Sequence, residues 1–420
     1  MHACLRLGRW SWECTRRPGK IFLERRTSSM QFIDLVSQQQ RLREKLESNI
    51  KAVLDHGQYI LGPEVKALEE CLGAYTGVRH AIACSSGTDA LLIALMAHGV
   101  GAGDAVFTTA FTFVATAEVI SLLGAVPVFV DIDPDTFNIS TAELERAVLA
   151  LEGNDPSLYP LPRFAPDAGK TAQPLKAKGV VAVDLYGLPA DYDAINAVAR
   201  RHGLFVIEDA AQSFGSESSG GKAGSLATIG CTSFFPAKPL GGYGDGGMCF
   251  TNDEVLAGRM RSISLHGQGR DRYENIRIGI NGRLDTLQAA VLLAKFEIFS
   301  EEVERRQEVA KIYTELLASR SSLVPPGVPD GYRSVWAQYT VRARNKAQRS
   351  LLRGRLEAVG IPTAVYYPRP LHLQKAFGAM GYAAGDLPVS ENYAGRVFSL
   401  PMHPYLKRED LERIVRRLRD

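Results

Sequence analysis

One lysine of this chain lies in a segment that restricts its freedom. Lys238 belongs to SFFPAKPLGGYGDGG, residues 233–247, and lies between Pro236 and Pro239. Each proline fixes its own φ and restrains the residue before it, so the backbone around the lysine is stiff. A lysine that attacks an aldehyde must be neutral, and an apolar setting favours this because desolvation lowers the pKa of an ammonium group. The segment therefore predicts a nucleophilic lysine.

The glycines after this lysine match a dinucleotide-binding sequence motif, but their predicted structural context does not match it. Residues 242–247, GYGDGG, fit G-x-G-x-x-G, but a dinucleotide site follows a strand and opens a helix. The residues that follow here, MCFTND, are typical of a strand. We therefore predict that these glycines allow close backbone packing beside Lys238, and that they form no nicotinamide or flavin site.

A second segment has the features of an anion site. In CSSGTDALLIALMAHG, an apolar helix is predicted after four small residues, Ser85, Ser86, Gly87 and Thr88. The free N–H groups and the positive end of such a helix favour a phosphate, and Gly87 would let it approach the backbone closely. Capping of the helix by Ser or Thr is the commoner use of these residues, so the segment alone leaves both interpretations open.

A third candidate lies where a predicted strand ends. The apolar run 204–207 leads into Glu208 and Asp209, and Gln212 follows. Sites of α/β proteins lie at the carboxyl ends of strands, where a carboxylate could keep a heterocycle nitrogen protonated. Capping of a following helix by Asp209 is the alternative. Three features together predict a pyridoxal phosphate site: a place for the phosphate at residues 85–88 (the phosphate seat), a carboxylate for the ring nitrogen, and a lysine in an apolar turn.

The elements that must position these residues alternate in type. Short apolar runs such as VPVFVDI, GVVAVDLYG and LFVIEDA are separated by stretches of helical periodicity. This pattern predicts an α/β fold with a mostly parallel sheet over residues 31–300. Within it, residues 153–178 hold five prolines and no periodicity, which indicates an inserted surface loop. One long helix is predicted over residues 284–318. Residues 301–420 are predicted to form a smaller C-terminal α+β domain.

Composition excludes several classes of protein. The net charge of +3 over 420 residues is too small to indicate a nucleic-acid or membrane-surface partner. No apolar run reaches the roughly 18 residues of a membrane span. The six cysteines form no C-x-x-C pair, which is typical of free thiols in the cytoplasm, and no metal site is predicted.

The first 30 residues differ from the rest. Seven Arg or Lys and two Glu occur there without helical or strand periodicity, so we predict a disordered basic leader. Its Arg-rich composition also allows a transit peptide, and Met30 could be the true first residue.

From about Phe32 to the C-terminus, the chain resembles the nucleotide-sugar aminotransferases of the DegT/DnrJ/EryC1/StrS family, which have the type I fold of pyridoxal phosphate enzymes. The likeness is carried by HGQYILGPEV, SSGTDAL, FTFVATAE, VDLYG, VIEDAAQSFG, TSFFPAKPLG, GDGG and INGRLDTLQAA. The resemblance implies that pyridoxal phosphate mediates transfer of an amino group from glutamate to a keto-sugar nucleotide.

The resemblance also implies roles for single residues. Lys238 would bind the cofactor aldehyde and then move a proton between the cofactor carbon and the sugar carbon. Asp209 would pair with the pyridinium nitrogen, and Gln212 would hydrogen-bond the phenolic oxygen. Phe113 would stack on the ring. The implied phosphate ligands are Gly87, Thr88 and Ser233, with Asn281 of the partner subunit. The implied sugar-nucleotide contacts are Gly57, Tyr59, Arg283, Tyr366 and Tyr367.

A narrower likeness in HGQYILGPE, RLDTLQAA and SLPMHPYL implies a UDP-linked N-acetylated 3-keto-uronate as the acceptor, in a pathway to surface polysaccharide such as O-antigen or lipopolysaccharide. Two positions depart from that pattern, because Ala237 replaces a frequent Ser and Tyr366 replaces a His. A neutral UDP- or dTDP-linked keto-deoxyhexose is therefore the alternative acceptor.

The resemblance further implies a homodimer with shared active sites, in which the INGRLDTLQAA loop reaches the neighbouring subunit. Two other functions exist on this fold: a non-catalytic sensor and a sugar dehydratase. The dehydratase has a histidine at the lysine position, and a sensor has no need of Lys238, Asp209 and Gln212 together. We therefore favour the aminotransferase.

Overall fold

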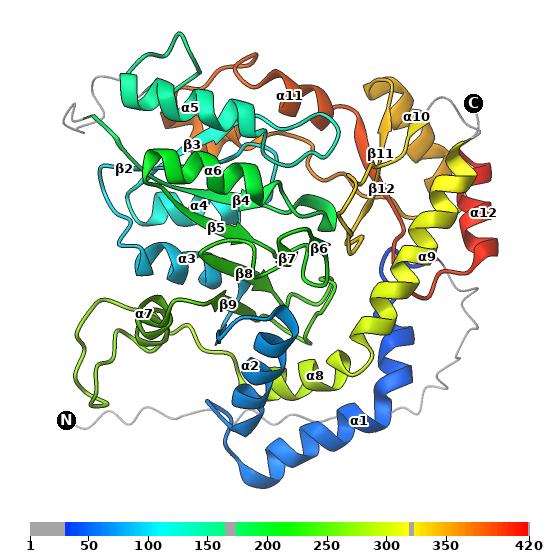
Figure 1. Cartoon of the computed structure of the whole chain (residues 1–420). Helices are drawn as coiled ribbons and strands as arrows, with labels where there is room; N and C mark the ends of the chain where they lie inside the picture. Colours follow the sequence, from blue (N-terminus) through cyan, green and yellow to red (C-terminus); the bar gives the residue numbers. More distant parts are fainter. Residues whose placement is uncertain (1–29, 164–173, 319–322, 419–420) are drawn as a thin grey trace, which may run out of the picture.

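A seven-stranded sheet forms the centre of the molecule (Figure 1). The computed structural model describes residues 30–163, 174–318 and 323–418. In the described chain the sheet has the order β1–β9–β8–β5–β4–β2–β3. Its strands are β1 (His80–Cys84), β2 (Asp104–Thr109), β3 (Val126–Val130), β4 (Lys176–Val183), β5 (Phe205–Asp209), β8 (Ile229–Ser233) and β9 (Gly247–Thr251). β9 is antiparallel to β1 and β8, and the other neighbours are parallel. The predicted α/β fold with a mostly parallel sheet is confirmed.

Side chains of these strands alternate between two apolar layers, as the two-residue period of a strand requires. On β1, Ile82 and Cys84 join one layer, and Ala81 and Ala83 join the other. Helices α3, α4 and α7 close the first layer. Helices α5 and α6 close the second over β2–β5, and α2 and α8 close it over β1 and β9. The bounds are α2 (Pro63–Thr76), α3 (Gly87–Ala97), α4 (Ala115–Leu122), α5 (Thr141–Gly153), α6 (Tyr192–His202), α7 (Glu254–Ser264) and α8 (Thr286–Phe296).

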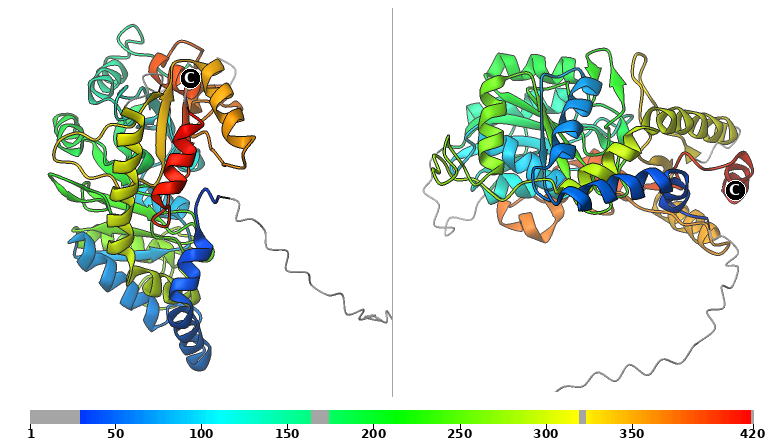
Figure 2. Two further views of the ribbon diagram at one scale, coloured as in Figure 1. Left: turned by 90° about the vertical axis from the view of Figure 1, so that its right-hand side faces the viewer. Right: turned by 90° about the horizontal axis from the view of Figure 1, so that it is seen from below.

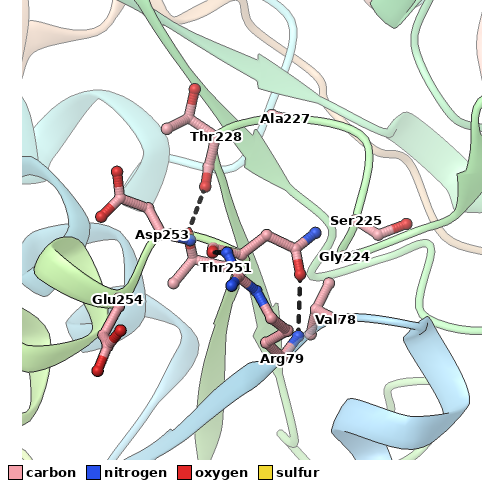
Figure 3. A pocket seen from close by; sticks show the side chains of 10 residues that line it. Val78, Arg79, Gly224, Ser225, Ala227, Thr228, Thr251, Asp253 and Glu254 are labelled. Carbon is pink, nitrogen blue, oxygen red and sulfur yellow. Dashed lines mark hydrogen bonds between the residues drawn. The ribbon is translucent and has the colours of Figure 1, made fainter.

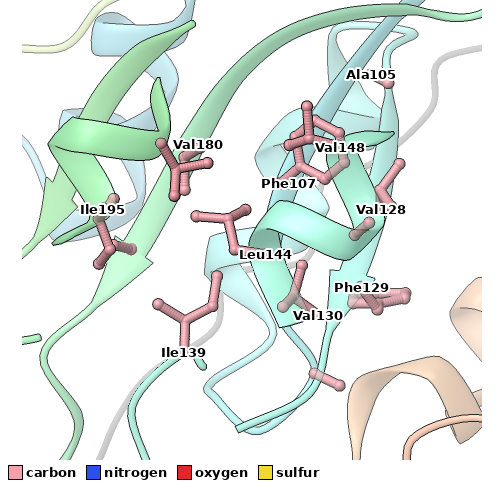
Figure 4. Packing of buried hydrophobic residues seen from close by; sticks show 14 of the residues in the cluster. Ala105, Phe107, Val128, Phe129, Val130, Ile139, Leu144, Val148, Val180 and Ile195 are labelled. Atoms are coloured by element: carbon pink, nitrogen blue, oxygen red, sulfur yellow. The ribbon is translucent and has the colours of Figure 1, made fainter. Parts of the chain in front are cut away.

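Figure 4 shows the layer beneath α5. Leu144 and Val148, four residues apart on that helix, are fully buried in one cluster with Phe107 of β2 and Val180 of β4. Burying a side chain of this size stabilises a fold by about 1.5–3 kcal/mol. This packing holds β4 in place beside β5, the strand that ends at Asp209.

The C-terminal part has its own small sheet. Strands β10 (Leu323–Val324), β11 (Tyr339–Ala343) and β12 (Val397–Leu400) pair antiparallel. Helices α9 (Phe299–Ala318), α10 (Lys346–Glu357) and α12 (Arg408–Arg416) pack on it around a buried aromatic core that includes Tyr313, Tyr339 and Phe398. The shorter elements are β6 (Glu217–Ser218), β7 (Gly221–Lys222), α11 (Pro388–Ala394) and three 3-10 turns, Leu185–Gly187, Leu371–Leu373 and Lys375–Met380.

The long helix predicted over 284–318 is two helices, because the chain breaks between α8 and α9 at Glu297 and Ile298. The apolar spacing continues across the break, which is why the sequence pattern does not reveal it. The division into domains at residue 300 stays a prediction. α9 contributes Phe299 to the core beside the central sheet and Tyr313 to the C-terminal core.

Parts of two predicted segments are not described by the structure. Residues 1–29 of the predicted leader and residues 164–173 of the predicted 153–178 loop lie outside the described residues. Helix α1 (Leu35–His56) lies at the bottom of the molecule in Figure 1 and therefore faces the viewer in the right-hand view of Figure 2; it packs on α8 through Leu42 and Leu46. Among the described residues, no helix is long and apolar enough to cross a membrane.

Candidate active site

The predicted site residues lie at one edge of the sheet, where three strands end and a fourth begins. β1, β5 and β8 run in the same direction, so Cys84, Asp209 and Ser233 end their strands at the same side. The antiparallel β9 begins there, with Gly247 opposite both Cys84 and Ser233. Segments far apart in the sequence therefore meet at the carboxyl edge, where α/β proteins bind ligands.

The predicted phosphate seat is formed by the first turn of α3. Ser86 is the N-cap, and its Oγ accepts a 3.0 Å hydrogen bond from Asp89 N–H. Capping thus uses Ser86, while the N–H groups of Gly87 and Thr88 have no acceptor among the described residues. A Cβ at Gly87 would lie 2.6 Å from Ser233 Cβ. The structure therefore brings Gly87, Thr88 and Ser233 together, with room only for glycine at position 87.

Asp209 lies at the tip of β5 with its side chain buried, 6% exposed. Its Oδ2 accepts a 2.8 Å hydrogen bond from Thr116 Oγ1, and its Oδ1 accepts one of 3.2 Å from Ala211 N–H. Burial raises the pKa of this carboxyl, while the Thr116 hydroxyl and the nearby Lys238 ammonium lower it. Turns follow β5, so the alternative that Asp209 caps a helix does not apply.

Lys238 follows the end of β8 by five residues. The turn that carries it is closed by a 2.8 Å hydrogen bond from Lys238 N–H to the Phe235 carbonyl. Burial lowers the pKa of its ammonium group, and the charge of Asp209 raises it. The two residues are thus close enough to interact electrostatically, and desolvation favours the neutral amine, as the sequence predicts.

The glycines after Lys238 pack against the turn that holds it. Gly242 N–H donates to the Phe234 carbonyl at 2.8 Å, and Phe234 N–H donates to the Gly246 carbonyl at 2.7 Å. A Cβ at Gly241 would lie 2.4 Å from the Pro236 oxygen. β9 follows these glycines, so the predicted role in close backbone packing is confirmed.

Two side chains of α8 hold this glycine loop, and sequence reasoning missed both. Lys295, 1% exposed, donates a 2.7 Å hydrogen bond to the Gly241 carbonyl. Gln288 Oε1 accepts a 2.8 Å hydrogen bond from Tyr243 N–H. Burial lowers the pKa of Lys295 to about 8. An apolar helix with one Lys and one Gln gives no sign of such a contact.

Aromatic and amide side chains line the next part of the site. Gln212 Oε1 accepts a 3.0 Å hydrogen bond from Tyr186 N–H, and its Nε2 donates to Tyr367 Oη at 3.3 Å. The ring of Tyr367 lies 6.4 Å from that of Phe113, which is 55% exposed. The structure thus places Gln212, Phe113 and Tyr367 together, and it adds Tyr186, which the sequence alone did not single out.

The predicted sugar-nucleotide residues near the N-terminus lie beside the start of α8. The Tyr59 carbonyl accepts a 2.9 Å hydrogen bond from Thr286 N–H, and Ile60 bridges to Asp285. Gly57 ends α1 with φ of 71°, a left-handed conformation that glycine adopts without strain. This arrangement brings Tyr59 close to the stretch that contains Arg283.

Asn281 and Arg283 contact each other, with a 2.9 Å hydrogen bond from Arg283 Nε to Asn281 Oδ1. Asn281 is exposed, and its backbone bridges to Leu265. The predicted contact between Asn281 and a phosphate involves a second subunit, so it stays a prediction.

These residues fit pyridoxal phosphate. The space between Gly87 and Ser233 admits no side-chain carbon, and two free N–H groups of a helix end there can receive a phosphate. Asp209 is a buried carboxylate for a pyridinium nitrogen, and Lys238 is a desolvated amine for the aldehyde. The exposed Phe113 ring offers a surface for stacking.

A hollow of about 430 Å³ lies at the opposite edge of the sheet (Figure 3). Two hydrogen bonds join polar groups of its lining: Arg79 N–H donates to Asn252 Oδ1 at 2.9 Å, and Thr251 Oγ1 donates to the Thr228 carbonyl at 2.8 Å. The hollow lies beyond the strand ends opposite to Lys238 and Asp209, so it is separate from the candidate active site.

Comparisons with known proteins find relatives over most of the chain. Residues 40–419 match the model of the DegT/DnrJ/EryC1/StrS aminotransferase family. The UDP-2-acetamido-2-deoxy-3-oxo-D-glucuronate aminotransferase of Pseudomonas aeruginosa is 49% identical over 90% of this chain and 96% of its own. The crystal structure of a DegT DnrJ EryC1 StrS aminotransferase from Brucella abortus is 48% identical and covers 93% of this chain and 98% of its own, with a TM-score of 0.85.

A third protein bears on the cofactor. NtdA of Bacillus subtilis, whose crystal structure holds the cofactor PMP, is 30% identical and covers 94% of this chain and 85% of its own, with a TM-score of 0.81. Aminotransferases of this family depend on pyridoxal phosphate, which confirms the predicted cofactor and enzyme class. The chain belongs to the DegT/DnrJ/EryC1/StrS aminotransferase family.

Proposed function

We propose that this protein transfers an amino group from glutamate to the keto carbon of a UDP-linked N-acetylated 3-keto-uronate. The observation that carries this proposal is that Lys238 and Asp209 lie close enough for their charges to interact, at the carboxyl edge of the sheet where Gly87 meets Ser233. The relative with 49% identity acts, by its name, on such a sugar. The aminated product would serve surface polysaccharide synthesis in the cytoplasm.

Pyridoxal phosphate, when bound, supplies the electron sink for this chemistry. Lys238, whose pKa is lowered by burial, would remove and return the proton at the reacting carbon. Asp209, held by Thr116, would keep a proton on the ring nitrogen. The N–H groups of Gly87 and Thr88 would hold and orient the phosphate.

Arg283 is the proposed partner of the sugar carboxylate. Its guanidinium can hold a carboxylate with two parallel hydrogen bonds. It lies on the stretch next to Tyr59, which we also assign to the sugar nucleotide. A neutral keto-deoxyhexose is the second candidate acceptor, because Arg283 could instead hold the nucleotide diphosphate, and because Tyr366 stands where the narrower pattern has His.

We propose that two subunits share each active site. Residues just before Asn281 expose large apolar side chains, with Tyr273 at 88% and Ile278 at 85% exposure. Apolar groups exposed to this extent are typical of surfaces that another chain covers. A second copy that covers them would bring Asn281 toward the neighbouring phosphate seat. Sedimentation velocity tests this, and an active monomer would refute it.

Spectroscopy and single half-reactions test the enzyme function. The purified protein should bind pyridoxal phosphate with visible absorbance, and glutamate should convert it to the amine form. Lys238→Ala should abolish turnover, whereas Lys66→Ala, at an exposed lysine of α2, should not. A protein that takes up no cofactor would contradict the proposal.

Substrate choice needs a separate assay. Arg283→Lys should raise KM for the keto-uronate much more than for a neutral keto-hexose nucleotide. Equal loss with both acceptors, or a wild-type preference for the neutral sugar, would favour the second candidate.

A further inference from the structure

Tyr186 has an unusual backbone for a large side chain. It lies just after β4, in the 3-10 turn Leu185–Gly187, with φ of 61° and ψ of 6°. Residues other than glycine rarely adopt this left-handed conformation, and those that do are frequent at binding sites. Its side chain is buried, 6% exposed. The fold therefore holds one particular aromatic residue in a strained position at the edge that carries the site.

Each polar group of Tyr186 holds a neighbouring segment. Its N–H donates to Gln212 Oε1 at 3.0 Å, and its carbonyl accepts from Gln338 N–H at 3.3 Å. Its hydroxyl donates to the carbonyl of Tyr366. The ring packs edge-on against Phe137, 5.7 Å between centroids. One side chain thus connects the central sheet to the C-terminal part of the chain.

The contacts converge on two adjacent residues. Tyr186 holds Tyr366 directly through its hydroxyl. It holds Tyr367 through Gln212, whose Nε2 donates to Tyr367 Oη at 3.3 Å. Residues 366–367 form one wall of the proposed sugar pocket, and Tyr367 also packs on Phe113. The position of this wall therefore depends on Tyr186.

We propose that Tyr186 is a positioning residue that determines acceptor specificity by fixing the Tyr366–Tyr367 wall. This inference rests on the proposed function, in which that wall faces the sugar nucleotide. The donor half-reaction involves the cofactor and Lys238. Tyr186 contacts a proposed cofactor residue only through its backbone N–H, which donates to Gln212, whereas its hydroxyl contacts the wall. The acceptor half-reaction needs a correctly placed wall. A change at the Tyr186 hydroxyl should therefore separate the two half-reactions.

Tyr186→Phe provides the test. It removes the hydroxyl that holds the Tyr366 carbonyl and leaves the backbone bond to Gln212 in place. We expect KM for the keto-sugar nucleotide to rise about tenfold, because the partly buried Tyr366 carbonyl loses its partner. We expect the rate with glutamate to change by less than about threefold, since the backbone groups that face the cofactor seat are retained. Discrimination between keto-uronate and neutral keto-hexose should fall.

Tyr313→Phe is the matched control. Tyr313 is fully buried in the C-terminal core, and its hydroxyl donates to the Pro401 carbonyl at 2.9 Å. The same atom is removed from the same kind of bond, but away from the proposed wall. An equal rise in KM in both variants, or no rise in Tyr186→Phe, would overturn the inference.

A failure of the proposed function can be distinguished from a failure of the inference on Tyr186. A wild type that reacts with glutamate but with neither sugar nucleotide would contradict the proposed function rather than the role of Tyr186. If Tyr186→Phe does not fold, Tyr186→His replaces it, because histidine tolerates a left-handed backbone and its shorter side chain does not reach the Tyr366 carbonyl. The same separation of half-reactions is expected, and an unchanged acceptor KM would overturn the inference.

Discussion

The hydroxyl of Thr116 donates a 2.8 Å hydrogen bond to the buried carboxylate of Asp209. Hydrogen bonds to charged groups contribute about 1.5–3 kcal/mol, so Thr116→Val should destabilise the ionised Asp209 and raise its pKa further. We expect the dissociation constant of pyridoxal phosphate to rise about tenfold or more, measured by absorbance titration of the apo protein. Thr76→Val is the control, because Thr76 is also buried and its hydroxyl donates to the Leu72 carbonyl. Equal effects in both variants would contradict a role for Thr116 at the cofactor.

Gly87→Ala should close the phosphate seat. The added Cβ would lie 2.6 Å from Ser233 Cβ, so either α3 or β8 must shift. We expect cofactor affinity to fall about a hundredfold, because the phosphate loses hydrogen bonds to a charged group that contribute about 1.5–3 kcal/mol. Gly258→Ala in α7 is the control, since no atom lies within 4 Å of its added Cβ. Normal cofactor binding by Gly87→Ala would show that the phosphate lies elsewhere.

Lys295→Met should lower turnover through the glycine loop. The variant keeps the volume of the side chain but loses the 2.7 Å bond to the Gly241 carbonyl. We expect kcat to fall about tenfold, because small displacements of a reacting group are costly. Lys311→Met, at an exposed lysine of α9, should leave kcat unchanged. A variant with wild-type kcat would mean that the loop holds its shape without Lys295.

Acid should destabilise the protein through His403. Burial lowers the pKa of this histidine from 6.5 to about 4. Between these values the unfolded chain binds a proton that the folded protein does not, so the free energy of unfolding falls as the pH falls. The loss amounts to about 3 kcal/mol at most. Urea unfolding of His403→Gln from pH 7 to pH 4 should show a shallower loss than the wild type. His266→Gln, at an exposed histidine, is the control and should lose stability with falling pH as steeply as the wild type. If all three proteins lose stability equally steeply, the effect does not come from His403.

The sequence predicts the local parts of the site. Lys238 and its glycines, the first turn of α3, and Asp209 at a strand end are each contained in one short segment. The residues that position them are not. Thr116 meets Asp209, Lys295 meets Gly241 and Tyr186 meets Tyr366 only after the chain has folded. Their types are common in cores and helices, so no pattern in the sequence distinguishes them.

The ends of helices are also not fully predictable from the sequence. The apolar spacing of residues 284–318 is continuous, yet the chain breaks between α8 and α9. This break allows α8 to pack on the glycine loop, through Gln288 and Lys295, while α9 turns toward the C-terminal core. Tertiary packing determines where the helix breaks, and the local periodicity of the apolar residues does not reveal this position.

The antiparallel β9 sets an order of events during synthesis. In the central sheet, β1 pairs only with β9, and Cys84 meets Gly247. A nascent chain on the ribosome therefore carries β1 and the first turn of α3 for a long time before their pairing partner emerges. Gly87 cannot meet Ser233 until then, so cofactor capture must await the end of β9. A stalled chain that ends before residue 247 should bind no pyridoxal phosphate, although it already contains Asp209 and Lys238.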